Sequence, residues 1–284
     1  MIDFTEAEFL FKYLSGTPES FGLNWLRMNE IFFKRADLFE DQNDCAVPVK
    51  FANSTRAKRR AYLESLISRQ VPTWSHNKTK QHIRKRERDA TIPKTPEARE
   101  KYDRKFGRKL THMFRICSLS RTNASEFMWK KYADSHKGFT IQYDAHALMK
   151  HIESLQLKVF PYPVEYRDVI EPFDLDELVK DDTYLKMMIF KLRSEWENER
   201  EVRIICYGPL PESPGRSAVT ELSNGFTLSI PFSAVAGVFL GQNSEQSLQE
   251  TITNTLHFKP HKIPLFKVLA VQNQLQLQIQ PIEY

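Results

Sequence analysis

The fold class can be inferred first from the stretch RICSLSRTNASEFMWKKYADSHKGFTIQYD, residues 115–144. Its two ends, 115–120 and 137–144, are short runs rich in Ile, Phe, Tyr and Thr, which is typical of β-strands. Between them, Phe127, Trp129 and Tyr132 crowd with Met128 in a short segment that we expect to be helical, followed by a turn at Gly138. The stretch therefore predicts a strand, a helix and a second strand in close succession.

The flanking sequence repeats these signals without a regular strand–helix–strand rhythm. We expect further strands at 200–208, 226–232 and 234–243, a helix over 19–30, and two final strands around a turn near Gln272 and Asn273. The segment 244–258 predicts an amphipathic helix that is capped at Ser244 or Ser247. This pattern favours an α+β fold with a mixed, mostly antiparallel sheet and flanking helices.

Length and composition limit the classes of protein to consider. The chain has 284 residues, of which 41% are hydrophobic, and we expect a single domain over residues 1–284. Its three cysteines form no C-x-x-C pair, which predicts a reducing compartment, by default the cytoplasm. Acidic residues stand where a signal peptide needs basic ones, and no apolar run is long enough for a membrane span, so we expect no membrane contact.

Positive charge is concentrated in one segment, Arg56–Lys109. This segment holds 18 lysines and arginines against 6 acidic residues, whereas the rest of the chain holds 23 basic and 30 acidic residues. We expect a basic insert of two helices, one over 56–71 that stops before Pro72 and one from Thr95 with Pro96 at its first position, joined by a mobile connection. Such an insert either contacts nucleic acid or an acidic protein, or is only a solvated surface.

Acidic residues gather in SEWENEREVRIICYG, residues 194–208. If the segment is extended from Trp196 onward, alternation places Glu197, Glu199, Glu201 and Arg203 on one face. As structure, this is an exposed strand face or the last turn of a helix with i,i+4 pairs. As function, it is a carboxylate pair able to hydrogen-bond sugar hydroxyls and stabilise positive charge on a ribose ring.

Other motifs for catalysis or metal binding are weak or absent. The chain lacks G-x-G-x-x-G, G-x-x-x-x-G-K-[ST], H-E-x-x-H and G-x-S-x-G, and the spacing of His257 and His261 is interrupted by Pro260, so we expect no metal site. The aromatic side chains of Trp129 and Tyr132 suit a stacking wall for a flat ligand or the core, and the sequence leaves both open.

Several segments, taken in order, resemble the bacterial domain-of-unknown-function family numbered 2971. They include residues 9–14, 30–44, 116–144, 163–168, 191–205 and 238–243. The most specific motifs are M-W-x-x-Y-A-x-x-H-x-G, here Met128, Trp129, Tyr132, Ala133, His136 and Gly138, and W-x-x-E-x-E-x-R, here Trp196, Glu199, Glu201 and Arg203. The segment 38–44 lacks the proline that the family tends to show, so we expect this loop to differ from that of the family.

The order of these motifs is also similar to that of ADP-ribosyltransferase-type folds of the Arg, Ser, Glu class. The similarity implies NAD as substrate, with Glu201 holding the ribose hydroxyl and facing the ribose cation, and Glu199 orienting or deprotonating the acceptor. The basic residue is Lys12, where the class usually has an arginine. The implied NAD-binding set is Lys12, Tyr13, Ser118, Ser120, Trp129, Tyr132, His136 and Arg203.

Three hypotheses for the function follow. In the first hypothesis, the chain is an NAD-consuming enzyme, such as a toxin or phage-defence effector, that acts on a macromolecule. This hypothesis requires that Lys12, the Ser118 strand and Glu201 converge on one pocket. Alternatively it is a non-catalytic module that binds nucleic acid, an acidic partner or a regulatory or neutralising protein, in which Glu199 and Glu201 pair with arginines. The third hypothesis is a nuclease in which Glu197, Glu199 and Glu201 hold Mg²⁺.

Overall fold

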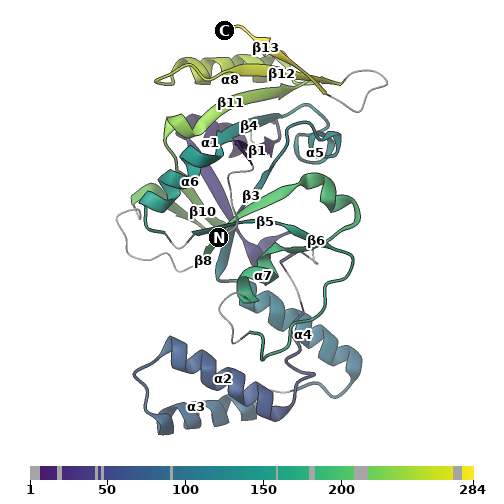
Figure 1. Cartoon of the computed structure of the whole chain (residues 1–284), viewed down its shortest axis with the longest axis vertical. Helices are drawn as coiled ribbons and strands as arrows, with labels where there is room; N and C mark the ends of the chain where they lie inside the picture. Colours follow the sequence, from purple (N-terminus) through teal and green to yellow (C-terminus); the bar gives the residue numbers. More distant parts are fainter. Residues whose placement is uncertain are drawn as a thin grey trace. The chain divides into compact units, whose positions relative to one another are not determined.

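The computed structural model describes residues 7–17, 21–41, 44–45, 48–89, 92–157, 159–178, 183–207, 217–270 and 277–284 (Figure 1). The chain forms two compact units. The first, which we call the sheet unit, consists of Met1–Arg35, Phe114–Val164 and Ser194–Tyr284. The second, the helical unit, consists of Ala36–Met113 and Glu165–Arg193, so it contains the whole basic insert, and each unit is described here by itself.

The sheet unit is built on a mixed sheet of eleven strands among its described residues. The order along the sheet is β13-β12-β11-β4-β1-β3-β2-β10-β9, and β8 pairs with both β3 and β5. The strands are β1 (Phe9–Leu14), β2 (Glu30–Arg35), β3 (Phe114–Ser120), β4 (Phe139–Asp144), β5 (Val159–Pro163), β8 (Glu201–Tyr207), β9 (Val219–Leu222), β10 (Gly225–Ser229), β11 (Val235–Gly241), β12 (Leu265–Ala270) and β13 (Leu277–Ile282).

Most strand pairs of this sheet are antiparallel, which confirms the predicted fold class. The exception is β11 with β12, which run parallel because helix α8 (Gln246–His257) connects them. The sheet also splits beside β3, since β1 pairs with β3 only at Phe11 and Ser120, whereas β8 pairs with β3 along its whole length. Expected strands are present at 114–120, 139–144, 201–207, 225–229 and 235–241, and the predicted turn near Gln272 lies outside the described residues.

Apolar side chains pack on both faces of this sheet. One face carries the larger core, to which α1 (Phe21–Met28), α6 (Ala145–Ser154) and α8 contribute Leu26, Leu148 and Ile252. The other face carries a smaller cluster in which Trp129 of α5 (Glu126–Tyr132) packs with Phe11 and Val268. Short 3₁₀ helices, η3 (Ser194–Glu199) and η5 (Phe232–Ala234), precede β8 and β11. The helices thus cover the sheet from both sides.

The helical unit has a core of its own. It contains η2 (Ala36–Leu38), α2 (Arg56–Gln70), α3 (His76–Asp89), α4 (Pro96–Thr111), β6 (Glu165–Arg167), α7 (Thr183–Ile189) and β7 (Phe190–Leu192), and β6 pairs with β7 in parallel. The ring of Phe51 packs against Tyr62 and Phe106. The carboxylate of Asp103 accepts a hydrogen bond from the backbone N–H of Ala52, so α4 is tied to the segment that precedes α2.

The helix boundaries of the basic insert are confirmed at two places and wrong at a third. Helix α2 ends at Gln70, before Pro72, and α4 starts with Thr95 as its cap and Pro96 at the first position, as the sequence predicts; Thr55 caps α2. The predicted mobile connection is instead helix α3. Ser75 accepts a hydrogen bond from the N–H of Lys78 at its start, and Ile83 is fully buried, so one apolar anchor and a run of helix-favouring residues are sufficient.

The expected serine cap of α8 is also wrong. The N-cap residue is Glu245, which makes no side-chain capping hydrogen bond, and Ser247 lies inside the first turn. The hydroxyl of Ser247 bonds to the carboxylate of Glu245 at 3.4 Å rather than to a backbone N–H. The helix therefore starts at Gln246, two residues after Ser244 and one residue before Ser247.

Candidate functional site

Strand β8 carries its polar side chains on one face. Its register with β3 pairs Glu201 with Ser120 and Arg203 with Ser118. Residues that face each other across an antiparallel pair point to the same side of the sheet, so these four side chains share a face. The opposite face of the two strands enters the larger core through Cys117, Leu119, Val202, Ile204 and Cys206. The predicted hydroxyl strand and the second glutamate therefore meet on adjacent strands.

Glu201 and Arg203 form a buried ion pair on that face. Nε of Arg203 donates to Oε1 of Glu201 at 2.8 Å, and Nη2 donates to Oε2 at 3.0 Å. The side chains are 0% and 7% exposed for Arg203 and Glu201. Two parallel hydrogen bonds fix the guanidinium plane, and each charge offsets the desolvation of the other. Both carboxylate oxygens of Glu201 are thus engaged by an arginine of the same strand.

Glu199 does not share this strand face, so the alternation predicted from Trp196 onward is wrong. Glu197 and Glu199 belong to the 3₁₀ helix η3, and Arg200 has a φ of 44°, which separates η3 from β8. Glu199 is nevertheless buried, and the hydroxyl of Tyr132 donates to its Oε1 at 2.6 Å. The structure therefore brings Glu199 beside α5 by a turn, not by strand alternation.

The two serines of β3 have different surroundings. The hydroxyl of Ser120 donates to the backbone oxygen of Glu199 at 2.7 Å and accepts from the N–H of Thr122, so it fastens the end of η3 to the sheet. The hydroxyl oxygen of Ser118 is buried and has no hydrogen-bond partner among the described residues. A buried hydroxyl without a partner is costly, and it marks a place where a polar group of a ligand or a water fits.

Trp129 packs in the core, which is the structural alternative that the sequence left open. Its ring is fully buried, stacks on His136 at 5.4 Å between ring centroids, and meets Tyr13 edge to face at 5.3 Å. The ring nitrogen Nε2 of His136 lies 2.9 Å from Oε2 of Glu126, and the hydroxyl of Tyr13 donates to the backbone oxygen of Thr122. Burial raises the pKa of Tyr13 far above its ordinary value. These three aromatic side chains hold α5 on the sheet.

The turn after α5 has an unusual backbone. Asp134, Ser135 and His136 have φ values of 48°, 52° and 67°, the left-handed region. The backbone oxygen of His136 accepts from the N–H of Asn243, and a Cβ at Gly241 would lie 2.1 Å from that oxygen. Only glycine fits there, so the end of β11 and this turn determine each other's position.

Lys12 lies apart from the polar face. By strand alternation it shares its face with Leu10 and Leu14, which belong to the larger core, and its Nζ donates to the backbone oxygen of Ser118 at 2.8 Å. Burial raises the pKa of the Cys117 thiol, and the Lys12 charge partly offsets this. The predicted set thus separates: Ser118, Ser120, Glu199, Glu201, Arg203 and Tyr132 gather, whereas Lys12, Tyr13, Trp129 and His136 have the other contacts described above.

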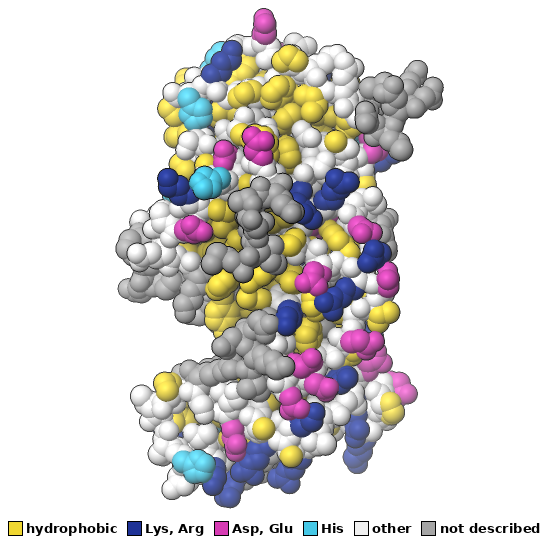
Figure 2. All heavy atoms as spheres, viewed as in Figure 1, with side chains coloured by type: hydrophobic (Ala, Val, Ile, Leu, Met, Phe, Trp, Pro, Cys, Tyr) yellow, Lys and Arg dark blue, Asp and Glu magenta, His cyan; other side chains and the backbone are white. Residues whose placement is uncertain are grey.

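The basic helices form a second candidate site, in the helical unit. On α2, Lys58 pairs with Asp176 at 2.6 Å, Arg60 pairs with Glu64 at 3.3 Å, and Arg59 donates to the backbone oxygen of Ser54. The hydrogen bond to Asp176 raises the pKa of Lys58. On α3, Lys78, Arg84, Lys85 and Arg86 are exposed. Lys and Arg side chains gather at the end of Figure 2 that corresponds to α2 and α3 in Figure 1.

A pocket of about 530 Å³ in the sheet unit was not anticipated from the sequence. It is lined by residues of α1, η5 and the end of α8, including Arg27, Phe232 and Phe258. The sequence gives one indication of this pocket. Phe258 and Lys259 directly follow the amphipathic pattern of α8, so the ring of Phe258 is not expected to pack on the buried face of the helix. None of the predicted site residues lines this pocket.

Comparison with known proteins identifies a family with a matching model. The model of the family described as a protein of unknown function (DUF2971) matches residues 128–204. This confirms the predicted resemblance for that stretch, which contains Tyr132, Glu199, Glu201 and Arg203 but neither Lys12 nor the basic insert. No curated protein and no solved structure matches the chain. The ADP-ribosyltransferase similarity stays a prediction.

Two further properties concern the described residues as a whole. No helix among them is both long and apolar enough to cross a membrane. Within the same residues, no three His, Cys, Asp or Glu side chains are grouped so that they could hold a metal ion. Glu197 is exposed on η3, while Glu199 and Glu201 are buried, so no observation favours the nuclease hypothesis.

Proposed function

We propose that the chain is a non-catalytic module that binds the phosphate backbone of a nucleic acid through helix α3. The observation that supports this proposal is the exposure of Arg84, Lys85 and Arg86 on α3, none of which has an acidic partner recorded among the described residues. Cations that neutralise phosphates release condensed counterions, which supplies affinity without base contacts.

Packing does not explain the charge of α3. Of its described side chains, only Ile83 is buried. Lys80 and Arg84 are four residues apart, and like charges at this spacing destabilise a helix. On the neighbouring helix α2, Lys58 and Arg60 are paired with carboxylates, and Arg59 is bonded to a backbone oxygen. Among the described residues, Arg84, Lys85 and Arg86 are therefore three consecutive exposed cations for which no acidic partner is recorded, an arrangement suited to binding a polyanion.

The side chains of Ser118, Ser120, Tyr132, Glu199, Glu201 and Arg203 form what we call the polar cluster of the sheet unit. Its contacts are consistent with the same hypothesis. The non-catalytic hypothesis predicts that Glu199 and Glu201 pair with arginines, and Glu201 is bonded through both oxygens to Arg203, whereas the described partner of Glu199 is a tyrosine. Glu199 accepts from the hydroxyl of Tyr132. In this view the cluster fastens η3 to β3 and α5, and its role is to hold the sheet unit together.

The test is fluorescence anisotropy with labelled 20-nucleotide duplex DNA and single-stranded RNA between 50 and 200 mM NaCl. The triple variant Arg84→Gln, Lys85→Gln, Arg86→Gln should weaken binding by about tenfold or more and reduce the slope of log K against log salt by about 2 to 3. The control removes the same charge from α4 through the exposed Lys101, Lys105 and Lys109. Equal losses in both variants, or no binding by the unmodified chain at 50 mM salt, would contradict the proposal.

A second candidate is NAD cleavage by an ADP-ribosyltransferase-like enzyme, acting in the cytoplasm as a toxin or phage-defence effector. One observation favours it: Ser118 lies opposite Arg203, which holds Glu201, and the Ser118 hydroxyl is buried without a partner among the described residues. A carboxylate held in a water-poor site would stabilise the ribose cation that forms as nicotinamide leaves. The position of Lys12 on the other face of the sheet gives no support for its predicted contact with the pyrophosphate.

The test of this candidate is release of free nicotinamide from NAD by the purified chain. Glu201→Gln should abolish release, whereas Glu221→Gln, at an exposed position of β9, should not affect it. Because Glu201→Gln also weakens the ion pair with Arg203, circular dichroism must show an intact fold for the comparison to count. No release by the unmodified chain, with or without added nucleic acid, would remove the candidate.

A further inference from the structure

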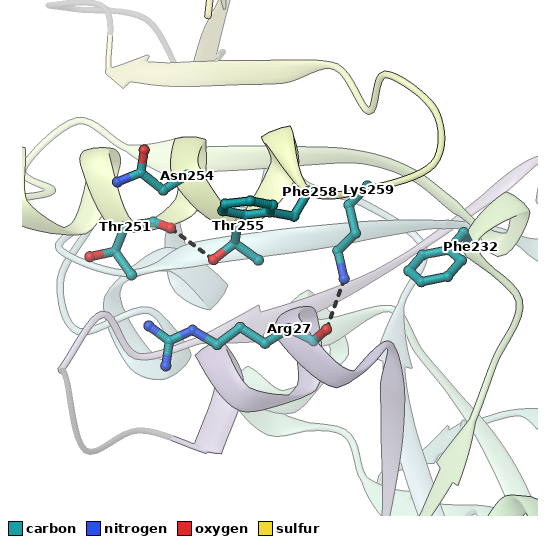
Figure 3. A pocket seen from close by; sticks show the side chains of 7 residues that line it. All are labelled: Arg27, Phe232, Thr251, Asn254, Thr255, Phe258 and Lys259. Carbon is teal, nitrogen blue, oxygen red and sulfur yellow. Dashed lines mark hydrogen bonds between the residues drawn. The ribbon is translucent and has the colours of Figure 1, made fainter.

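The pocket beside α1 and the end of α8 has the features of a small-molecule site (Figure 3). Its volume, about 530 Å³, lies in the range of sites for small organic ligands. All its lining residues belong to the sheet unit, so the site does not depend on the helical unit. It shares no residue with the polar cluster or with α3, and a ligand here would be a property separate from the proposed function.

The lining is positively charged. Arg27 and Lys259 are its charged residues, and no acidic side chain lines the pocket. Nζ of Lys259 donates to the backbone oxygens of Leu26 and Arg27, the end of α1, at 2.6 and 2.9 Å, so this cation is fixed in place. Partial burial lowers the pKa of Lys259, which indicates that its charge is partly desolvated. An anion entering the pocket would meet this field without repulsion.

The guanidinium of Arg27 is the cation available to a ligand. Figure 3 shows it extending along the pocket toward Thr251, away from Lys259. No partner is recorded for it, or for the side-chain amide of Asn254, among the residues that the structure describes. These two groups can therefore donate hydrogen bonds to an anionic group at this end of the pocket.

The remaining lining consists of two phenylalanines, Phe232 and Phe258, and two threonines, Thr251 and Thr255. The side chain of Phe258 is 90% exposed, and its ring lies beside Thr255 in the middle of the view. Phe232, 38% exposed, lies at the other end with Nζ of Lys259 over its ring at 4.9 Å. A phenylalanine that is almost fully exposed buries almost no apolar surface on folding, and its ring offers a flat face for stacking. The chemistry of the wall is that of a ring-binding surface.

We propose that this pocket binds a small planar aromatic anion, with its ring against Phe258 and its anionic group on Arg27. Aromatic carboxylates and mononucleotides share this chemistry. Arg27 supplies a planar pair of donors suited to a carboxylate or phosphate, and Phe258 supplies the face on which a ring stacks. A neutral ring would keep the stacking and lose the charge interaction.

The test uses two fluorescent probes with the same ring system, 1-anilinonaphthalene-8-sulfonate, which is anionic, and N-phenyl-1-naphthylamine, which is neutral. Phe258→Ala should weaken binding of both probes by about fivefold or more, whereas Arg27→Gln should weaken only the anionic probe by about the same factor. Matched controls at exposed positions of the sheet unit are Phe160→Ala and Lys150→Gln, and both should bind as the unmodified chain does.

The natural class of ligand is then separated by competition against the anionic probe. Displacement by indole-3-acetate but not by indole identifies an aromatic carboxylate, and displacement by adenosine monophosphate but not by adenosine identifies a mononucleotide. The proposal is overturned if the unmodified chain does not bind the anionic probe below about 1 mM, which corresponds to about 4 kcal/mol of binding. Unchanged binding in both Arg27→Gln and Phe258→Ala overturns it as well.

Discussion

Strand β8 and helix α3 both carry charged side chains, but these are buried and paired on β8 and exposed to solvent at residues 84–86 of α3. On β8, Arg203 is fully buried and bonded to Glu201 through two hydrogen bonds. On α3, Arg84 and Lys85 are exposed, with no acidic partner recorded among the described residues. Buried charge must be compensated inside the protein, whereas exposed charge is compensated by water, salt or a partner.

This difference predicts whether a substitution in each region affects folding or binding. A substitution on β8 leaves an opposite charge without water and without a partner, so it should affect folding. A substitution on α3 removes a solvated group, so it should affect binding and leave folding nearly unchanged. The following predictions separate these two effects.

The largest effect is expected from Arg203→Met, which keeps an apolar stem and removes the charge. It leaves Glu201 buried without its cation and should lower the free energy of unfolding by about 3–5 kcal/mol. Urea unfolding followed by circular dichroism measures this, with Arg121→Met at an exposed position as control. The double variant Glu201→Gln, Arg203→Met should recover part of the loss, and a single-variant loss below about 1 kcal/mol would argue against a compensated pair.

A second prediction concerns the neighbouring thiol of β8. Burial raises the pKa of Cys206 to about 12, from an ordinary value of 9.0. The folded chain then holds this proton more tightly than the unfolded chain, so the stabilisation is complete below pH 9 and is lost as the pH rises toward 12. By pH 10.5 the free energy of unfolding should fall by about 2 kcal/mol through this group.

The measurement compares urea unfolding of the unmodified chain and of Cys206→Ala at pH 8.5 and 10.5. Tyrosines with raised pKa values, such as Tyr143, titrate in both proteins and cancel in the comparison. The fall with pH should therefore be smaller in Cys206→Ala by about 2 kcal/mol. Identical falls in the two proteins would mean that the thiol is not shielded as the structure describes.

A smaller effect is expected from Tyr132→Phe. The ring is retained, but the buried carboxylate of Glu199 loses the donor at 2.6 Å, which should cost about 1–2 kcal/mol of stability. Thermal unfolding is a suitable measurement. Tyr207→Phe, at a ring that is 44% exposed on β8, is the control and should be neutral. A neutral Tyr132→Phe would indicate that Glu199 has sufficient donors elsewhere.

The smallest effect on folding is expected from the α3 variant Arg84→Gln, Lys85→Gln, Arg86→Gln. Its free energy of unfolding should stay within about 0.5 kcal/mol of that of the unmodified chain, since the side chains are solvated. At low salt it should be equal or slightly more stable, because the like-charge pair Lys80–Arg84 is removed. A large loss of stability would show that α3 uses these cations within the protein.

The strand and helix content was predictable where local signals are strong. Runs such as FTIQYD and the Thr95–Pro96 start of α4 are fixed by side-chain types alone, and both are confirmed. Helix α3 was missed because its single apolar anchor, Ile83, gives no periodic pattern. Its formation depends on packing beside α2 and on many weak helix preferences, which a search for apolar spacing does not detect.

The candidate site was predictable in composition but not in geometry. Sequence identified Glu199, Glu201 and Arg203 as a unit, and the structure brings them to the same region. The turn at Arg200, with its positive φ, breaks the alternation and cannot be recognised from residue types. The face on which Lys12 lies depends on the register of β1 with β4, which is a long-range property.

The segment that contains the basic helices leaves the sheet at the end of β2 and returns at the start of β3, and these two strand ends are paired with each other. Lys34 is paired with Ile116 and Arg35 with Arg115, although the helices α2, α3 and α4 lie between them in sequence. The entropy of closing a loop grows only slowly with its length, so β2 and β3 can remain neighbours whatever the size of the inserted segment. The basic helices are thus inserted between two paired strands, so the size of this segment can change without a change in the pairing of β2 with β3.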